Sequence, residues 1–135
     1  MWRSNKLSIP ASIQDRVIFT GHLPLEELVD ITASALALTY VPYFEGFGIP
    51  LVEAMKCGTP ILAANTTSLP EVVGNAAIYC NPFETSEIAE GIQKLITDET
   101  LRSNLSIAGL KRSELFSWDA SSRKVWEIIE DSYRN

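Results

Sequence analysis

LALTYVPYFEGFGIPLVEAMKCGTPILAA, residues 36–64, holds the pattern that decides the fold of this chain. The stretch opens with an apolar run at 36–41 and closes with a second one at 60–64. Such runs are typical of strands buried on both faces of a parallel sheet. Between them, residues 49–57 read as a helix, and Pro50 fits its first turn, where the missing N–H costs nothing. The sequence therefore predicts a strand, a glycine-containing loop, a helix and a second strand, in that order.

The alternation of strand and helix continues on both sides of this stretch. Further strands are predicted at residues 17–20 and 76–80, and helices at 23–35, 71–73 (a short turn), 86–97, 99–115 and 118–133. We expect an α/β fold: a Rossmann-like doubly wound parallel sheet of about four strands with three C-terminal helices. Ligands bind such sheets at the carboxyl ends of the strands. Residues 1–15 are expected to be irregular. Because the sheet is small, we expect residues 1–135 to form one partial domain.

Composition narrows the range of partners. The chain has 135 residues, 46% of them hydrophobic and 21% charged, as in an ordinary globular domain. A net charge of -6 without clusters of Lys and Arg argues against nucleic acid. No segment approaches the roughly 18 apolar residues of a membrane span. We expect a cytoplasmic protein, peripheral at the inner membrane face at most.

Metal and cysteine chemistry are not indicated. The five aspartates form no Asp-x-Asp pair, so no metal site is expected. Cys57 and Cys80 have no CxxC spacing and are predicted to be reduced thiols of the core.

The loop before the predicted helix carries the features of an anion site. Gly46 and Gly48 flank Phe47 immediately before the helix begins. The free N–H groups and the positive dipole end of a helix N-terminus suit a phosphate, and glycine lets the ligand approach closely. A Gly-x-Gly before a helix is, however, common in proteins without such a ligand.

Two glutamates make the prediction more specific. Glu45 precedes the loop, and Glu53 lies four residues beyond Ile49, roughly 6 Å along the helix axis. A carboxylate beside a diphosphate is repelled unless it accepts hydrogen bonds from vicinal hydroxyls, as sugars offer. We therefore predict a diphosphate with sugar hydroxyls on each side. The alternative is that Glu45 only favours the helix N-terminus while Glu53 pairs with Lys56 on the surface.

The block EGFGIPLVEAMKCGTP, residues 45–60, resembles the Glu-x7-Glu signature of retaining glycosyltransferases of family 4, the glycosyl transferases group 1. The resemblance extends from Arg16 to Trp118 through RVIFTG, AANTTSLPEVVGNAA and FSW. It implies that the chain is the C-terminal, donor-binding part of a GT-B fold, with a mannosyltransferase-like character. Val41-Pro42 stands where Pro-Ser is common in the family, so a hydroxyl contact at that point is not expected.

The resemblance also implies roles for individual residues. Glu45 would be the catalytic residue that contacts the donor sugar, and Glu53 would hold the ribose. The segment Gly21-His22-Leu23 would lie beside the nucleobase, although His22 also suits a solvated loop. Glu71 would lie near the donor or act only as a helix-dipole partner. The sugar and diphosphate would be approached by Gly46, Phe47, Gly48, Leu51 and Val52.

The reaction implied is transfer of a hexose, with mannose favoured, from a UDP- or GDP-sugar to a glycan or polysaccharide acceptor. Anomeric configuration would be retained, without a cofactor. The family holds the diphosphate with an Arg and a Lys from earlier strand-helix units, and binds the acceptor in an N-terminal domain. Near the loop this sequence offers only Lys56. We therefore expect a fragment that is inactive alone.

Two other interpretations remain open. A non-catalytic nucleotide-sugar-binding or interaction module would keep the same fold. A nucleotide-sugar epimerase would suit the sheet but would fit the full Glu-x7-Glu block less well, and the extra catalytic acids it needs are not visible. The apolar residues of the C-terminal helices fit core packing. In a fragment they would be exposed, so self-association through these helices is also expected.

Overall fold

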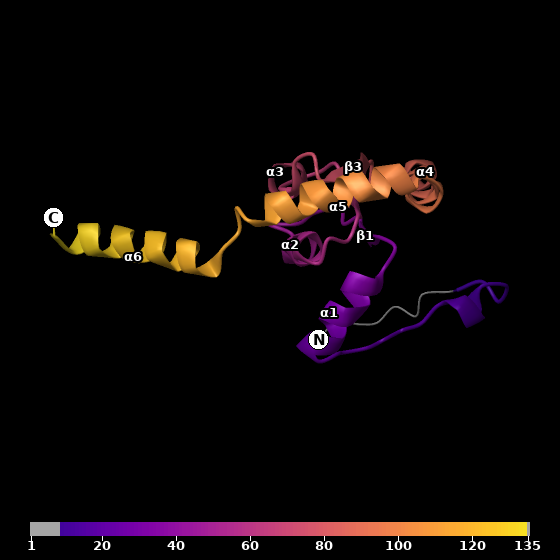
Figure 1. Ribbon diagram of the computed structural model, residues 1–135, viewed down its shortest axis with the longest axis horizontal. Helices are drawn as coiled ribbons and strands as arrows, with labels where there is room; N and C mark the ends of the chain where they lie inside the picture. Colours follow the sequence, from indigo (N-terminus) through magenta and orange to yellow (C-terminus); the bar gives the residue numbers. More distant parts are fainter. Residues whose placement is uncertain (1–8, 135) are drawn as a thin grey trace.

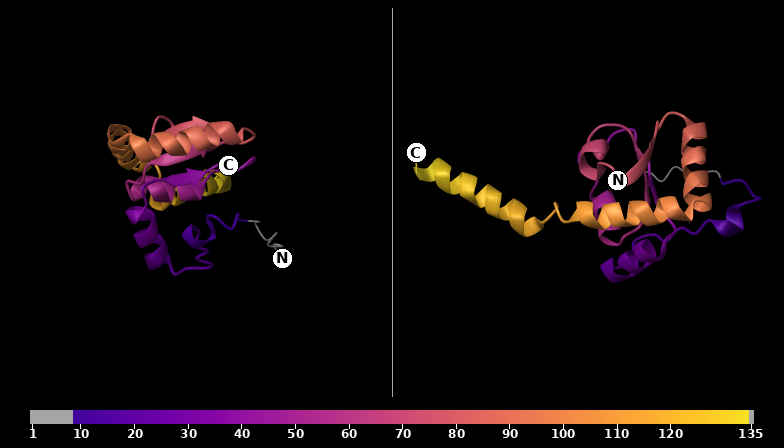
Figure 2. Two further views of the ribbon diagram at one scale, coloured as in Figure 1. Left: turned by 90° about the vertical axis from the view of Figure 1, so that its right-hand side faces the viewer. Right: turned by 45° about the horizontal axis from the view of Figure 1, so that its top comes forward.

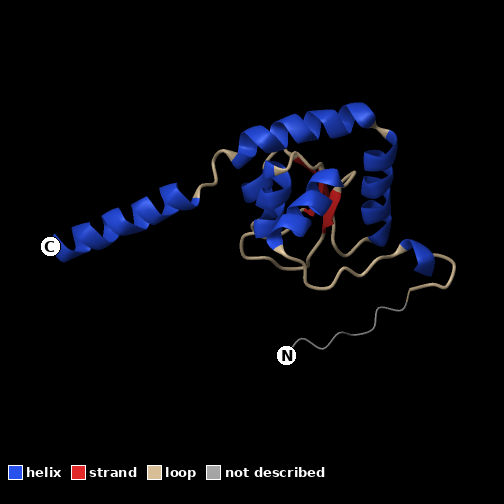
Figure 3. Ribbon diagram, turned by 60° about the horizontal axis from the view of Figure 1, so that its bottom comes forward, coloured by secondary structure: helices blue, strands red, loops and turns tan. Residues whose placement is uncertain are grey.

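The computed structural model describes residues 9–134 and has a parallel sheet at its centre. Its strands are β1 (Leu38–Tyr40), β2 (Ile61–Ala64) and β3 (Ala77–Cys80), in the order β1-β2-β3. Leu38 pairs with Ile61, and Ile61 pairs with Ala77 on the other side. Figure 3 shows these strands enclosed among the helices. The predicted α/β class is confirmed for this part of the chain.

Helices lie on both faces of the sheet, and Figure 1 labels them. They are α1 (Leu25–Ser34), α2 (Ile49–Lys56), α3 (Leu69–Val73), α4 (Thr85–Thr97), α5 (Glu99–Ser113) and α6 (Trp118–Arg134), with a 3-10 turn η1 (Gln14–Arg16) before them. Helix α2 packs against β1, α3 and α5, whereas α4 packs against β2 and β3. Each predicted helix is present, with bounds that differ by a few residues.

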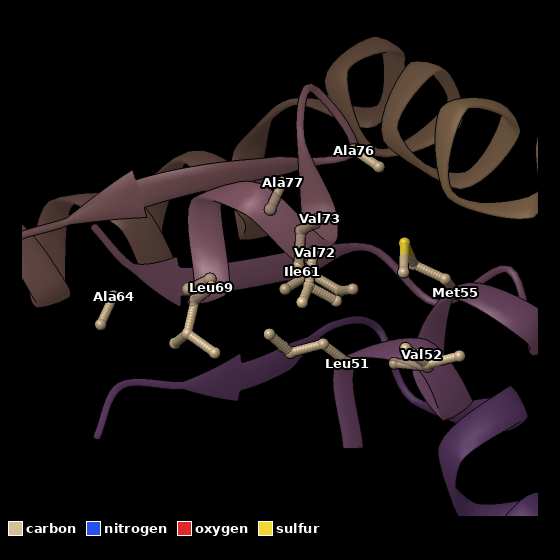
Figure 4. Close-up of a cluster of buried hydrophobic side chains, with 12 residues drawn as sticks. Leu51, Val52, Met55, Ile61, Ala64, Leu69, Val72, Val73, Ala76 and Ala77 are labelled. Atoms are coloured by element: carbon tan, nitrogen blue, oxygen red, sulfur yellow. The ribbon is translucent and has the colours of Figure 1, made fainter. Parts of the chain in front are cut away.

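The core lies on the two faces of β2, which is buried at every position. On one face, Ile61 and Ala63 pack with residues of α2 and α3 such as Leu51 and Leu69 (Figure 4). On the other face, Leu62 packs with α4 and α5. Since burying a leucine or isoleucine side chain stabilises a protein by roughly 1.5–3 kcal/mol, this double burial fixes β2 and the loops at its ends.

Both cysteines are free thiols, as predicted. Cys80 is buried in β3, and burial raises the pKa of its thiol. Cys57, at the end of α2, is only half-buried, so its predicted place in the core is wrong.

One predicted strand is wrong. Residues 17–20 belong to no strand, and the side chains of Ile18 and Phe19 are 84% and 69% exposed. Val17 has extended dihedral angles, φ -112° and ψ 120°, which its β-branched side chain favours. A strand also needs a neighbour to exchange hydrogen bonds with. Within residues 9–134 no strand of the sheet pairs with this segment, so the described sheet has three strands instead of about four.

The N-terminal segment was predicted to be irregular over residues 1–15. Residues 1–8 lie outside the described part of the chain. Residues 11–13 form a turn that continues into η1.

Two helices stand apart from the packed body. Helix α6 projects away from it in Figure 1 and in the right-hand view of Figure 2, and α1 lies beside α2. Neither helix has a buried residue. Among residues 9–134, no helix is long and apolar enough to cross a membrane.

Candidate functional site

The loop from β1 to α2 ends in a glycine that no other residue could replace without strain. Gly48 caps α2 with φ 92° and ψ 52°, in the left-handed region. A Cβ atom there would lie 2.8 Å from Cδ2 of Leu69. Pro50 occupies the first turn of α2, as predicted. The loop backbone therefore lies tightly over α3 at the start of α2.

Glu45 is held by its own loop and by the preceding strand. The Tyr40 hydroxyl donates a hydrogen bond of 2.5 Å to Oε2 of Glu45. Oε1 accepts from the backbone N–H groups of Gly46 at 3.0 Å and Phe47 at 3.3 Å. These bonds favour the charged form, and the Tyr40 hydroxyl, followed by the Phe47 amide, lowers the pKa of Glu45. The carboxylate is thus fixed and ionised.

The loop after β2 supports Glu45 from the other side. Thr67 Oγ1 accepts a hydrogen bond from the Glu45 amide at 3.3 Å, and the Ser68 hydroxyl donates to the Glu45 carbonyl at 2.8 Å. Thr67 has φ 53°, which costs a β-branched residue of order 1–3 kcal/mol. The loops that follow the adjacent parallel strands β1 and β2 therefore meet at Glu45, at the carboxyl edge of the sheet.

Glu53 lies on the exposed side of α2, where it lines two hollows. One, of about 250 Å³, lies between α2 and the segment that joins α5 to α6. The other, of about 270 Å³, lies between α2 and α1. Lys56 lines both hollows too, but no salt bridge within residues 9–134 joins it to Glu53. The surface pairing that would have explained Glu53 is therefore not formed.

The remaining residues predicted to meet the sugar and diphosphate differ in how far their side chains are exposed. The side chains of Leu51 and Val52 are buried in the core, so only their backbone could meet a ligand. The Leu51 amide donates to the Gly48 carbonyl at 3.0 Å. Phe47 is half-exposed, and its ring meets Phe116 edge to face at 5.8 Å between centroids.

Two predicted positions have no hydrogen bond to Glu45 among residues 9–134. The segment 21–23 precedes α1, with Gly21 at φ 64° and His22 exposed. It has no hydrogen bond to the Glu45 cluster among the described residues. The exposed Glu71 is in the first turn of α3, and its carbonyl accepts a hydrogen bond from Arg112 at 2.5 Å. These roles stay predictions.

The guanidinium of Arg112 donates to the carbonyls of Val72 and Glu71, which ties α5 to the end of α3. Within residues 9–134 no group of three or more His, Cys, Asp or Glu side chains could hold a metal ion.

Comparison with known proteins identifies the family of this chain. A model of the glycosyl transferases group 1 matches residues 3–112. The chain belongs to this family. O-antigen chain mannosyltransferase B of Escherichia coli is 38% identical over 101 residues, and MMP alpha-(1->4)-mannosyltransferase of Mycolicibacterium hassiacum is 33% identical over 131 residues. The alignments cover 75% and 94% of this chain but only 26% and 32% of those relatives.

A solved structure supports the same assignment. Sucrose-phosphate synthase from Thermosynechococcus elongatus, a GT-B protein, matches with a TM-score of 0.85 and 27% identity. The match covers 91% of this chain and 32% of that chain. The family and the Rossmann-like GT-B architecture inferred from the Glu-x7-Glu block are thereby confirmed.

The residues that hold Glu45 in this glycosyltransferase chain could not be predicted from the sequence pattern. Tyr40 lies in an apolar run and reads as a core aromatic, and Thr67 and Ser68 read as an ordinary polar loop. Their contacts depend on how the two loops close over each other. The one available signal was AANTTSLPEVVGNAA, which the family resemblance already contained.

Proposed function

We propose that this chain carries the donor-binding surface of a retaining glycosyltransferase. The donor is a nucleotide-diphosphate sugar, and the hexose is transferred to a glycan or polysaccharide acceptor. The observation that supports this best is Glu45, an ionised carboxylate fixed beside the N-terminus of α2 at the carboxyl edge of the sheet. An acceptor-only group there suits the hydroxyls of a sugar.

The donor would lie along the start of α2. The diphosphate would meet the helix N-terminus at Gly48, where the dipole and the backbone amides favour negative charge. Glu45 would accept hydrogen bonds from the sugar, and Glu53 would bind the ribose from the exposed side of the same helix. The hollow between α1 and α2, lined by Glu53, would lead toward the nucleobase and the segment 21–23.

Transfer needs more than this surface. A departing diphosphate must be neutralised. Lys56 is the basic residue of α2, and Arg112 is engaged with the carbonyls of α3. We propose that further basic groups and the acceptor-binding surface lie in a region equivalent to the part of the relatives that this chain does not match. We also propose that the chain alone is inactive. Sugar transfer by the purified chain would contradict this.

The relatives support a finer proposal for the sugar alone. Mannose is the proposed hexose because two of the relatives described are mannosyltransferases. UDP and GDP are the proposed nucleotides, and no metal or other cofactor is invoked. A cytoplasmic location, peripheral at the inner membrane face at most, stays part of the proposal, as does self-association through the exposed apolar helices.

Calorimetric titration with UDP, GDP and ADP tests the proposal. We expect one nucleotide to bind selectively, and Glu53→Ala to abolish that binding by removing the ribose contact. Glu90→Ala is the matched control, because Glu90 is an exposed glutamate on α4, on the other side of the sheet. Absence of binding by all three nucleotides at millimolar concentration would favour the non-catalytic interaction module instead.

A further inference from the structure

Tyr40 is the residue that joins Glu45 to the rigid part of the fold. It is the last residue of β1 and pairs with Ala63 of β2 in the ladder. Its ring packs against the core cluster of α2, α3 and the sheet, while its hydroxyl reaches Glu45. We propose that Tyr40 is a positioning residue that orients the Glu45 carboxylate toward the donor sugar. This inference rests on the proposed function.

The hydrogen bonds around Glu45 define what Tyr40 contributes. A carboxylate has about four acceptor positions, two on each oxygen. Oε1 takes the amides of Gly46 and Phe47, and Oε2 takes the Tyr40 hydroxyl. This leaves one position on Oε2 for a ligand hydroxyl. Without Tyr40, the carboxylate would be held through Oε1 alone, and Oε2 would no longer be fixed relative to β1.

The direction of the Tyr40 bond suits a sugar. The bond to Glu45 raises the pKa of Tyr40 to about 12, so the hydroxyl stays protonated and donates at neutral pH. Glu45 stays an acceptor, because the same bond lowers its pKa. A hydrogen bond from a neutral donor to a charged acceptor is also shorter and stronger than one between neutral groups. Tyr40 thereby keeps the carboxylate in the form that receives hydroxyl protons.

The rest of Glu45 is held by weaker supports. Its backbone is fixed by Thr67 and Ser68, which lie on a loop. Groups on a strand position a site more accurately than groups on loops. Tyr40 is the one residue that ties the carboxylate itself to a strand among the described hydrogen bonds.

The test compares two tyrosines of the same sheet. Tyr40→Phe keeps the ring and removes only the hydroxyl. Tyr79→Phe is the matched control, because the Tyr79 hydroxyl donates to the Gly74 carbonyl at 2.6 Å and does not reach Glu45. Each variant is titrated with the nucleoside diphosphate, UDP or GDP, and with the matching nucleotide sugar. Thermal unfolding confirms that each variant folds.

We expect Tyr40→Phe to weaken binding of the nucleotide sugar by about fivefold, as for the loss of one hydrogen bond. Binding of the nucleoside diphosphate should stay unchanged, because this ligand lacks the sugar that Glu45 contacts. Tyr79→Phe should behave as the wild type with both ligands. In a Glu45→Ala background, Tyr40→Phe should add no further loss. Equal weakening of both ligands by Tyr40→Phe would overturn the positioning role.

A second readout separates this inference from the proposed function. Carbon-13 NMR follows the titration of the Glu45 carboxyl in the unliganded chain. Its midpoint should rise in Tyr40→Phe and not in Tyr79→Phe, and an unchanged midpoint would overturn the link between Tyr40 and Glu45. Failure of the wild type to bind any nucleotide would instead overturn the proposed function, and with it the sugar as the target of the positioned carboxylate.

Discussion

The packed body and the outlying helices differ sharply in what their apolar residues do. In β2 all four residues are buried, and Leu51, Ala54 and Met55 of α2 are fully inaccessible. Helices α1 and α6 bury nothing, although α6 carries Val125, Trp126 and Ile129 on a strongly amphipathic pattern. The spacing of apolar residues therefore predicts a helix and its apolar side. It does not predict whether that side is covered.

The candidate site belongs to the packed body. Glu45, Tyr40 and Gly48 all contact the body, through β1, α3 and the loop after β2. The geometry of the site thus depends on the core and not on α6. Substitutions in the two regions should consequently have very different effects.

The largest effect is expected in the central strand. Leu62 is fully buried and meets Gly91 of α4 so closely that a Cβ there would lie 2.6 Å from its Cδ1. Leu62→Ala should lower the free energy of unfolding by about 2–5 kcal/mol, since it leaves a cavity. Leu25→Ala, on α1 where the side chain is 70% exposed, should change it by about 0.5 kcal/mol or less. Urea denaturation measures the free energy of unfolding of both variants. Similar losses in the two variants would contradict the difference between the packed body and the outlying helices.

A smaller effect is expected at the glycine loop. Gly48→Ala places a Cβ at φ 92° and within 2.8 Å of Leu69, so we expect a loss of about 1–3 kcal/mol. Gly46→Ala is the matched control, because nothing lies within 4 Å of its Cβ position. The same denaturation experiment compares them. If Gly46→Ala proved the more destabilising, the loop geometry would be wrong.

The Glu45 cluster should give a modest pH dependence. The pKa of Glu45 is lowered from its ordinary value of 4.5, first by the Tyr40 hydroxyl. The native state then binds fewer protons than the unfolded state, so this stabilisation is present above pH 4.5 and lost as pH falls through the native pKa. In Tyr40→Phe the acid decline should be shallower. Thermal unfolding from neutral to acid pH measures it, and parallel curves would count against the bond.

Much of the body could be predicted from the sequence, because local patterns agree with tertiary packing there. The strands at Leu38–Tyr40, Ile61–Ala64 and Ala77–Cys80 and helix α2 fall where apolar runs, Pro50 and Gly48 place them. The family could be predicted from the Glu-x7-Glu block, and the family model that matches residues 3–112 confirms it.

The remainder depends on contacts that no local pattern contains. Residues 17–20 have strand composition, yet strand formation requires a partner that the described sheet does not supply. Tyr40 reads as a core residue, and only the closure of two loops turns its hydroxyl toward Glu45.

The smallest effect on stability is expected in α6. Trp126 is 61% exposed, so Trp126→Ser should change the unfolding free energy by about 0.5 kcal/mol or less. It should nevertheless reduce self-association, because an exposed apolar face favours association. Sedimentation velocity at increasing concentration measures this. A wild-type chain that stays strictly monomeric would rule out association through α6.

An NMR titration of the chain with a nucleotide sugar shows whether the donor binds at the Glu45 loop. We expect the amides of Gly46, Phe47 and Gly48 to shift together with a single dissociation constant, whereas those of Glu90 and Lys94 on α4 should not move. Shifts confined to α4, or none at the loop at millimolar donor, would contradict a donor site at Glu45.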